Sequence, residues 1–235
     1  MTVKHGDAVA VAAALRMAKR DAVVAADVQR GCVVVFDRAV EAPDPAAVRR
    51  LGKSLSKALT CPVFAAANED DDVFRYWLFA GGRAVDAFDS GRERVSEQHV
   101  RTPAGGQVVI ARFDPDRPLG ALSPAQLARW KPAARAKDER GGNAQVLAET
   151  LGVPAAAERA MRVLLNDYDV ELDRHRALCK VLGLSPWAVG VGYEDVAAGR
   201  LPAGVRASQV VGVGSAAPGD ERARIGRKAA TRRGR

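Results

Sequence analysis

Four consecutive acidic residues, Glu69, Asp70, Asp71 and Asp72, are the strongest candidates for a metal site in the sequence. Carboxylate oxygens bind Mg²⁺ and Ca²⁺, and together with Asp37 these acids could serve a metal-dependent hydrolase. However, side chains alternate in an extended chain, so adjacent acids do not converge on one ion. Because Asp also favours turns, we interpret the four acids as a turn and predict no metal site.

A second acidic tract, "NDYDVELDRH" at 166–175, has the spacing of the start of a calcium-binding EF-hand loop. Leu172 stands where that loop needs a glycine, and Leu178 stands where it needs a bidentate glutamate. The acids Glu171 and Asp173 instead suit the first turn of a helix, where the helix dipole favours negative charge. The tract therefore predicts a helix start.

The usual signatures of enzymes are incomplete in this chain. The histidines His5, His99 and His175 have no metal-ligand spacing, and the sequence contains neither a nucleophile elbow nor a phosphate-binding loop. His175 falls on the same helical face as Cys179, which favours a core or boundary histidine over a catalytic Cys-His pair. We predict no catalytic residue and no bound cofactor.

The net charge of +8 is concentrated in the last residues of the sequence. Residues 222–235 contain seven basic residues and no acid, which leaves the rest of the chain close to neutral. Such a segment favours nonspecific attraction to nucleic acid phosphates. The nucleic-acid hypothesis therefore assigns binding to Arg222, Arg224, Arg227, Lys228, Arg232, Arg233 and Arg235.

Residues 174–199 offer a second route to nucleic acid, because they have the rhythm of a degenerate helix-turn-helix. Gly183 lies near the expected turn, and Ser185 could cap the second helix. Against this interpretation, Gly190 and Gly192 would lie inside the recognition helix, where each costs about 1 kcal/mol relative to alanine.

Composition favours a cytoplasmic protein. The cysteines Cys32, Cys61 and Cys179 are odd in number and far apart, so they suggest neither a disulfide framework nor a zinc knuckle. The apolar residues 8–15 are interpreted as a surface helix. No stretch approaches the roughly 20 apolar residues that a membrane span needs, so we expect no membrane partner.

The first half of the sequence predicts a sheet backed by a helix. The run "RGCVVVFDRAV" (30–40) is typical of a buried strand, and Asp44 followed by Pro45 predicts the start of the clearest helix. The segments "VFAAAN", "VFRYWLFA" and "RAVDAFDS" predict three further strands. Gly81 and Gly82 mark a hairpin turn between the last two.

The second half has a helical pattern. One more strand is predicted at 107–113, and a helix capped by Ser123 follows it. Three short helices are expected in "NAQVLAETLG", "PAAAERAMRVLLNDY" and "ELDRHRALCKVLG".

These elements predict an α+β protein with an antiparallel β-meander backed by a helix, followed by a mainly helical C-terminal half. The sheet region is expected at 1–115, and a helical region at 120–205 packs on or beside it. A disordered basic tail is expected at 206–235. The first two regions could form one core or two domains.

Two segments resemble bacterial proteins of unknown function. The residues "CPVFAAANEDDDVFRYWLFAGGRAVDAFDS" (61–90) and "LCKVLGLSPWAVGVGYEDVAAGRLP" (178–202) are similar to uncharacterised bacterial α+β proteins. In those proteins an aspartate precedes an aromatic strand, and a helical part ends in Leu-Gly-aliphatic-Pro. Here Ser185 is inserted before the proline. The resemblance implies that both segments belong to one architecture.

The leading functional hypothesis is a cytoplasmic, non-enzymatic protein that acts through contacts with a protein partner. The first alternative is a nucleic-acid-associated protein that uses the basic tail or the helix-turn-helix. The second alternative is the metal-dependent hydrolase with Asp37 and the acids 70–72.

Overall fold

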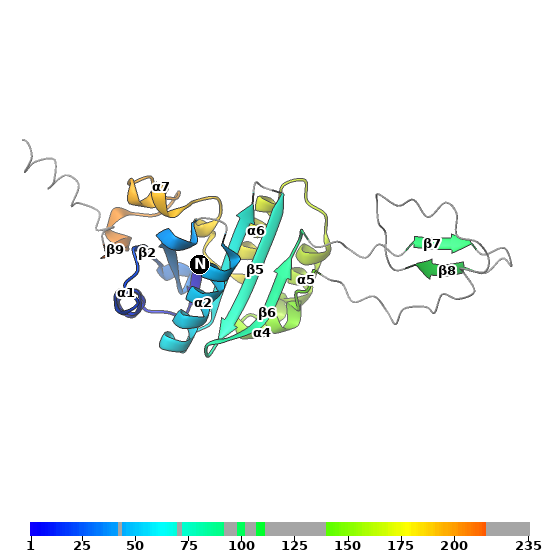
Figure 1. Cartoon of the computed structure of the whole chain (residues 1–235), viewed down its shortest axis with the longest axis horizontal. Coiled ribbons are helices and arrows are strands. Elements are labelled where there is room, and N and C mark those ends of the chain that lie inside the picture. The colour runs from blue at the N-terminus through cyan, green and yellow to red at the C-terminus, as the bar shows by residue number, and fades with distance from the viewer. Residues whose placement is uncertain (42–43, 70–71, 92–97, 102–106, 111–139, 215–235) are drawn as a thin grey trace, which may run out of the picture. The chain divides into compact units, whose positions relative to one another are not determined.

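Figure 1 shows the computed structural model of the chain. The structure describes residues 1–41, 44–69, 72–91, 98–101, 107–110 and 140–214. The chain divides into two compact units, of which the first comprises residues 1–89 and 142–235 and the second comprises residues 90–141. In the second unit β7 (Gln98–Arg101) pairs with β8 (Gln107–Ile110) as an antiparallel hairpin.

A seven-stranded antiparallel sheet forms the centre of the first unit. Its strand order is β6-β5-β4-β1-β3-β2-β9. The central order β4-β1-β3-β2, with one helix after β1 and another after β3, is the ferredoxin-like topology of two interlocked split βαβ units. The strands are β1 (Thr2–Lys4), β2 (Ala22–Asp27), β3 (Cys32–Asp37), β4 (Val63–Glu69), β5 (Val73–Ala80), β6 (Arg83–Asp89) and β9 (Val210–Val213).

Helices α1 (Ala8–Met17) and α2 (Pro45–Leu59) cover one face of this sheet. An aspartate side chain caps each helix: Asp7 accepts a hydrogen bond from the Ala10 amide and Asp44 accepts one from the Ala46 amide. Aliphatic side chains of both helices then pack on the inward residues of the strands. The two helices therefore share one core.

Helices from the C-terminal half cover the opposite face. Figure 1 shows α4 (Ala144–Thr150), α5 (Ala157–Leu165) and α6 (Glu171–Leu182) behind β5 and β6. Alternation along β5 explains how both faces are filled. Phe74, Tyr76 and Leu78 pack against these helices, whereas Trp77 and Phe79 pack towards α1 and α2. The short α7 (Tyr193–Ala197) covers β2 and β3 on the same side as α4–α6.

The predicted α+β class is confirmed, and the meander β4-β5-β6 lies where it was expected. The prediction of the sheet was incomplete, because β1, β2 and β9 add to it. The tail predicted to begin at 206 is also corrected at its start. Val210–Val213 forms β9, whose backbone pairs with residues 22–25 of β2.

The helices of the C-terminal half begin close to their predicted positions. Asn143 caps α4, and Gly183 ends α6 in the left-handed conformation. The predicted strand at 107–113 corresponds to β8 over its first four residues. The helix predicted after Ser123 lies outside the described residues.

Candidate functional site

Glu69 and Asp72 lie where β4 ends and the chain turns towards β5. Glu69 ends β4, and the Asp72 amide donates a hydrogen bond to the Glu69 carbonyl at 3.0 Å. The Glu69 carboxylate also pairs with Arg75 on the next strand. Asp70 and Asp71 lie outside the described residues.

Asp37 is engaged by an arginine. Its carboxylate oxygens accept hydrogen bonds from Arg20 at 2.8 and 2.5 Å, and the Ala39 amide donates to one of them at 3.0 Å. The carboxylate therefore ties β3 to the segment that follows α1. Within the part of the chain that the structure describes, no group of three or more His, Cys, Asp or Glu side chains could hold a metal ion.

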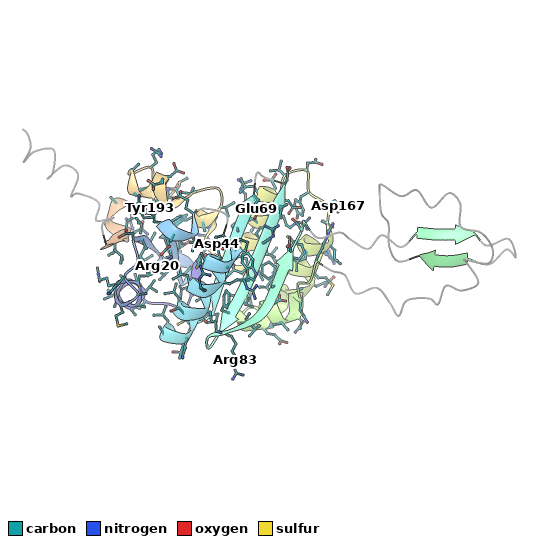
Figure 2. All side chains as sticks on the ribbon, in the orientation of Figure 1. Arg20, Asp44, Glu69, Arg83, Asp167 and Tyr193 are labelled. Carbon is teal, nitrogen blue, oxygen red and sulfur yellow. The ribbon has the colours of Figure 1, made fainter. Side chains whose placement is uncertain are left out.

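The described residues form a cleft of about 690 Å³. The ends of β3 and β4, the start of α2 and residues 188–193 line it. In Figure 2, the lining residues Asp44, Glu69 and Tyr193 come from three separate segments of the fold. The cleft is thus assembled from parts that are far apart in the sequence.

The acids of the cleft already have structural partners. Asp37 binds Arg20, Glu69 binds Arg75 and Asp44 caps α2. Glu41 accepts hydrogen bonds from the Glu194 amide at 3.0 and 3.2 Å, so it holds the start of α7. These four carboxylates therefore stabilise the fold as well as lining the cleft.

His175 is buried on α6, as expected of a core histidine, and its partner is an asparagine. Its Nδ1 atom lies 3.0 Å from Asn68 Nδ2 on β4. Burial lowers the pKa of His175 to about 3 and raises the pKa of Cys179 to about 12. Both side chains are buried in the core, and the imidazole contacts an asparagine of the sheet.

The second acidic tract starts a helix, as predicted. Glu171 and Asp173 lie in the first turn of α6. Glu171 pairs with the buried Arg174, and Asp173 pairs with the exposed Arg176. Arg174 also donates to the carbonyls of Val163 and Leu164 at the end of α5. Arg174 therefore links α6 to the end of α5.

Residues 174–199 do not form the two helices of a helix-turn-helix. After α6 ends, Pro186–Ala188 forms a single 3-10 turn, and the next helix, α7, has five residues. Trp187 and Tyr193 are buried against β2 and β3. Trp187, which would have to face the base pairs, is therefore part of the core.

The basic residues assigned to nucleic acid binding lie outside the described residues. They are Arg222, Arg224, Arg227, Lys228, Arg232, Arg233 and Arg235. Their role stays a prediction.

The outer face of α1 is apolar. Val9 is 74% exposed and Met17 is 78% exposed, and Ala10 and Ala13 lie exposed between them. We call these four residues the apolar row. The helix sequence "AVAVAAALRM" contains the signal, because Arg16 is the one charged residue of a helix that lies at the surface. The sequence predicted a surface helix here, but that prediction did not include its apolar outer face.

The outer face of α2 is basic. Arg49, Lys53 and Lys57 are exposed at four-residue spacing, and the exposed Arg83 follows the β5–β6 turn. We call these four residues the basic row. The signal in the sequence is a helix of 15 residues that contains four basic residues and no acid.

Comparison of the chain with protein-family models, curated proteins and solved structures found no match. Functional arguments therefore depend on the geometry of this molecule. No helix within the described ranges is both long enough and apolar enough to cross a membrane.

Proposed function

We propose that this protein is a non-enzymatic protein that acts through protein–protein contacts, and that it binds a second copy of itself through the apolar row on α1. The observation that carries the proposal is the exposure of Val9 and Met17 on a helix whose other side is already buried. Apolar side chains gathered on one exposed face mark interaction sites.

Strand β9 extends the apolar surface beyond α1. Val211 is 38% exposed and alternates with Gly212, so it lies on the same face of the sheet as Val213. Val213 belongs to the core under α1. The edge of the sheet next to α1 is therefore apolar as well.

The spacing of the row suits a second copy of the same helix. When two α1 helices pack antiparallel about a two-fold axis at Ala13, Val9 of each copy faces Met17 of the other. The alanines Ala10 and Ala13 lie near the crossing point, where small side chains let helix axes approach to roughly 8 Å. The contact is self-complementary, as a two-fold interface requires.

The charges at the ends of the row also complement each other. Asp7 is exposed at the start of α1, and Arg16 and Lys19 are exposed at its end. Antiparallel packing brings the acidic end of one helix next to the basic end of the other. The opposed helix dipoles add to this attraction.

The contact is small for a permanent dimer. A standard interface uses about 20 residues or more on each side, and the row with Val211 supplies far fewer. We therefore expect a reversible, concentration-dependent dimer.

Light scattering over a range of protein concentrations tests the proposal. The parent protein should shift towards the mass of a dimer as its concentration rises. Met17→Glu should remain monomeric, because it places two carboxylates in the apolar contact. Met161→Glu is the matched control, since Met161 is 51% exposed on α5, away from the row. A parent protein that is monomeric at every concentration, or an equal effect of both variants, would contradict the proposal.

We further propose that the protein works in the reducing cytoplasm. The three cysteines, Cys32, Cys61 and Cys179, are all free thiols in the structure. Disulfides are rare under reducing conditions, so this state supports the compartment inferred from the sequence. Growth of cells that express a tagged chain, followed by fractionation, tests it, and recovery in the secreted fraction would contradict it.

A further inference from the structure

The basic row on α2 is positioned by the folding of the helix itself. Val48, Leu51 and Leu55 pack on the sheet, and Arg49, Lys53 and Lys57 face outward. Gly52 allows α2 to lie close to the sheet, because a Cβ atom there would come within 2.5 Å of the Phe79 ring. The helix is thereby fixed with its basic side towards solvent.

Among the residues that the structure describes, no acid pairs with the charges of this row. Arg49, Lys53, Lys57 and Arg83 make no ion pair with any residue that the structure describes. Arg50, on the same helix, reaches Asp44 only at 3.5 Å, and both side chains are largely exposed. The outer face of α2 therefore carries uncompensated positive charge.

On two other helices of this protein, exposed arginines pair with acids of the same helix. On α5, Arg162 pairs with Glu158, and on α6, Arg176 pairs with Asp173. On α2 the neighbours at four-residue spacing have the same charge, which destabilises an isolated helix. A locally unfavourable pattern of this kind is expected where a surface serves a ligand.

The row is also extended in one direction. Four residues of helix rise roughly 6 Å, so Arg49 and Lys57 are roughly 12 Å apart along the axis. The β5–β6 turn lies against Lys57, because a Cβ atom on Gly82 would be 2.8 Å from Lys57 Cβ. Arg83 comes directly after that turn and points away from the fold in Figure 2. The row therefore suits a ligand with repeated negative charges.

We propose that the basic row binds the phosphate backbone of duplex nucleic acid without reading its sequence. The four side chains are lysine and arginine, which contact phosphates, and the row has no Asn or Gln that would read base edges. No aromatic side chain is among the large exposed hydrophobic residues of the described chain, so single strands have no surface for base stacking.

An acidic membrane is the competing ligand for such a surface. Helices that bind membranes combine basic residues with large apolar ones that enter the acyl region. The outer face of α2 has no large exposed hydrophobic residue. Duplex phosphates therefore fit this face better than a bilayer does.

The test measures binding of the full chain to a short fluorescent DNA duplex of mixed sequence at several salt concentrations. The triple variant Arg49→Gln/Lys53→Gln/Lys57→Gln should bind at least about tenfold more weakly at low salt. The slope of log K against log salt should become shallower by about 3, because each lost phosphate contact removes nearly one unit.

A matched triple variant, Arg159→Gln/Arg176→Gln/Lys180→Gln, removes the same charge from exposed positions on α5 and α6. It should keep most of the binding and the salt slope. An equal loss in both triple variants would show an effect of net charge alone and would overturn the proposal. Absence of duplex binding by the parent chain would also overturn it.

Binding by the basic row must also be distinguished from binding by the C-terminal segment and from binding to lipid. A chain that ends at residue 221 should retain duplex binding that depends on the row. Loss of all binding in that chain, together with parental binding by the α2 variant, would assign the interaction to residues 222–235 and overturn the proposal. Vesicles of acidic phospholipid are the last probe. If the basic row binds these vesicles but not the duplex, the proposal is overturned as well.

Discussion

Helices α1 and α2 occupy equivalent places in the two split βαβ units, yet their outer faces are opposite in character. Both begin at an aspartate cap, and both bury aliphatic side chains against the same face of the sheet. Outside, α1 carries the apolar row and α2 carries the basic row. Packing against the sheet determines only the inner face of a helix, so the outer face is where the two helices can serve different partners.

The inner faces of the two helices should contribute alike to stability. Leu15 and Leu55 are both fully enclosed in the core under the helices. Leu15→Ala and Leu55→Ala should each lower the free energy of unfolding by about 2–5 kcal/mol, because each leaves a cavity. Chemical denaturation measures both. A loss confined to one variant would show that one helix does not share the common core.

Acid should destabilise the fold from the opposite face of the sheet, where α6 packs. His175 lies beneath Phe74, and burial lowers its pKa to about 3, from an ordinary value of 6.5. The unfolded chain therefore takes up a proton below pH 6.5 that the folded chain does not. The stability is complete above that pH and is lost as pH falls towards 3, by about 1.4 kcal/mol per pH unit from this group.

Denaturation curves at successive pH values measure this loss. His175→Gln should flatten the dependence between pH 6.5 and 3, whereas His5→Asn, at an exposed position, should preserve it. Identical slopes in all three proteins would contradict the assignment to His175.

The smallest predicted effect is a change in stability that distinguishes the outer face of α2 from that of α1. Lys53→Glu places an acid between Arg49 and Lys57, so two repulsive pairs become attractive ones. It should raise the free energy of unfolding by about 0.5 kcal/mol. The same variant should weaken duplex binding.

Ala13→Glu is the matched change on α1, where the neighbours at four-residue spacing are Val9 and Met17. It should bring a smaller gain in stability, because Arg16 is its one basic neighbour on the helix, and it should prevent dimer formation. Chemical denaturation of both variants checks the pair. An equal gain in both would mean that the charges of α2 do not repel each other.

Local signals explain which elements could be predicted from the sequence. Asp44 and Pro45 define the start of α2 within the chain itself, and Gly81-Gly82 defines the hairpin between β5 and β6. Strands β1 and β9 have three and four residues, too few for a pattern of alternation. They become strands because they pair with distant parts of the chain.

The candidate sites also divide into those with a local signal in the sequence and those formed by distant parts of the chain. The turn at Glu69 was predictable from adjacent acids. The contact between Asn68 and His175 joins residues 107 positions apart, and the cleft combines segments that are far apart in the sequence. Only the folded sheet brings these groups together. The two outer faces were readable from composition, but their exposure needed the fold.

Cross-linking at the two-fold axis tests most directly the claim that two copies of the protein bind each other through α1. Ala13→Cys should form a covalent dimer readily under mild oxidation, because each copy places this residue opposite itself within the reach of a disulfide. Ala18→Cys, exposed at the end of α1 but turned away from the row, should cross-link no faster than the native Cys61 background. Equal cross-linking of both variants, or of neither, would contradict the account of α1 as the contact surface.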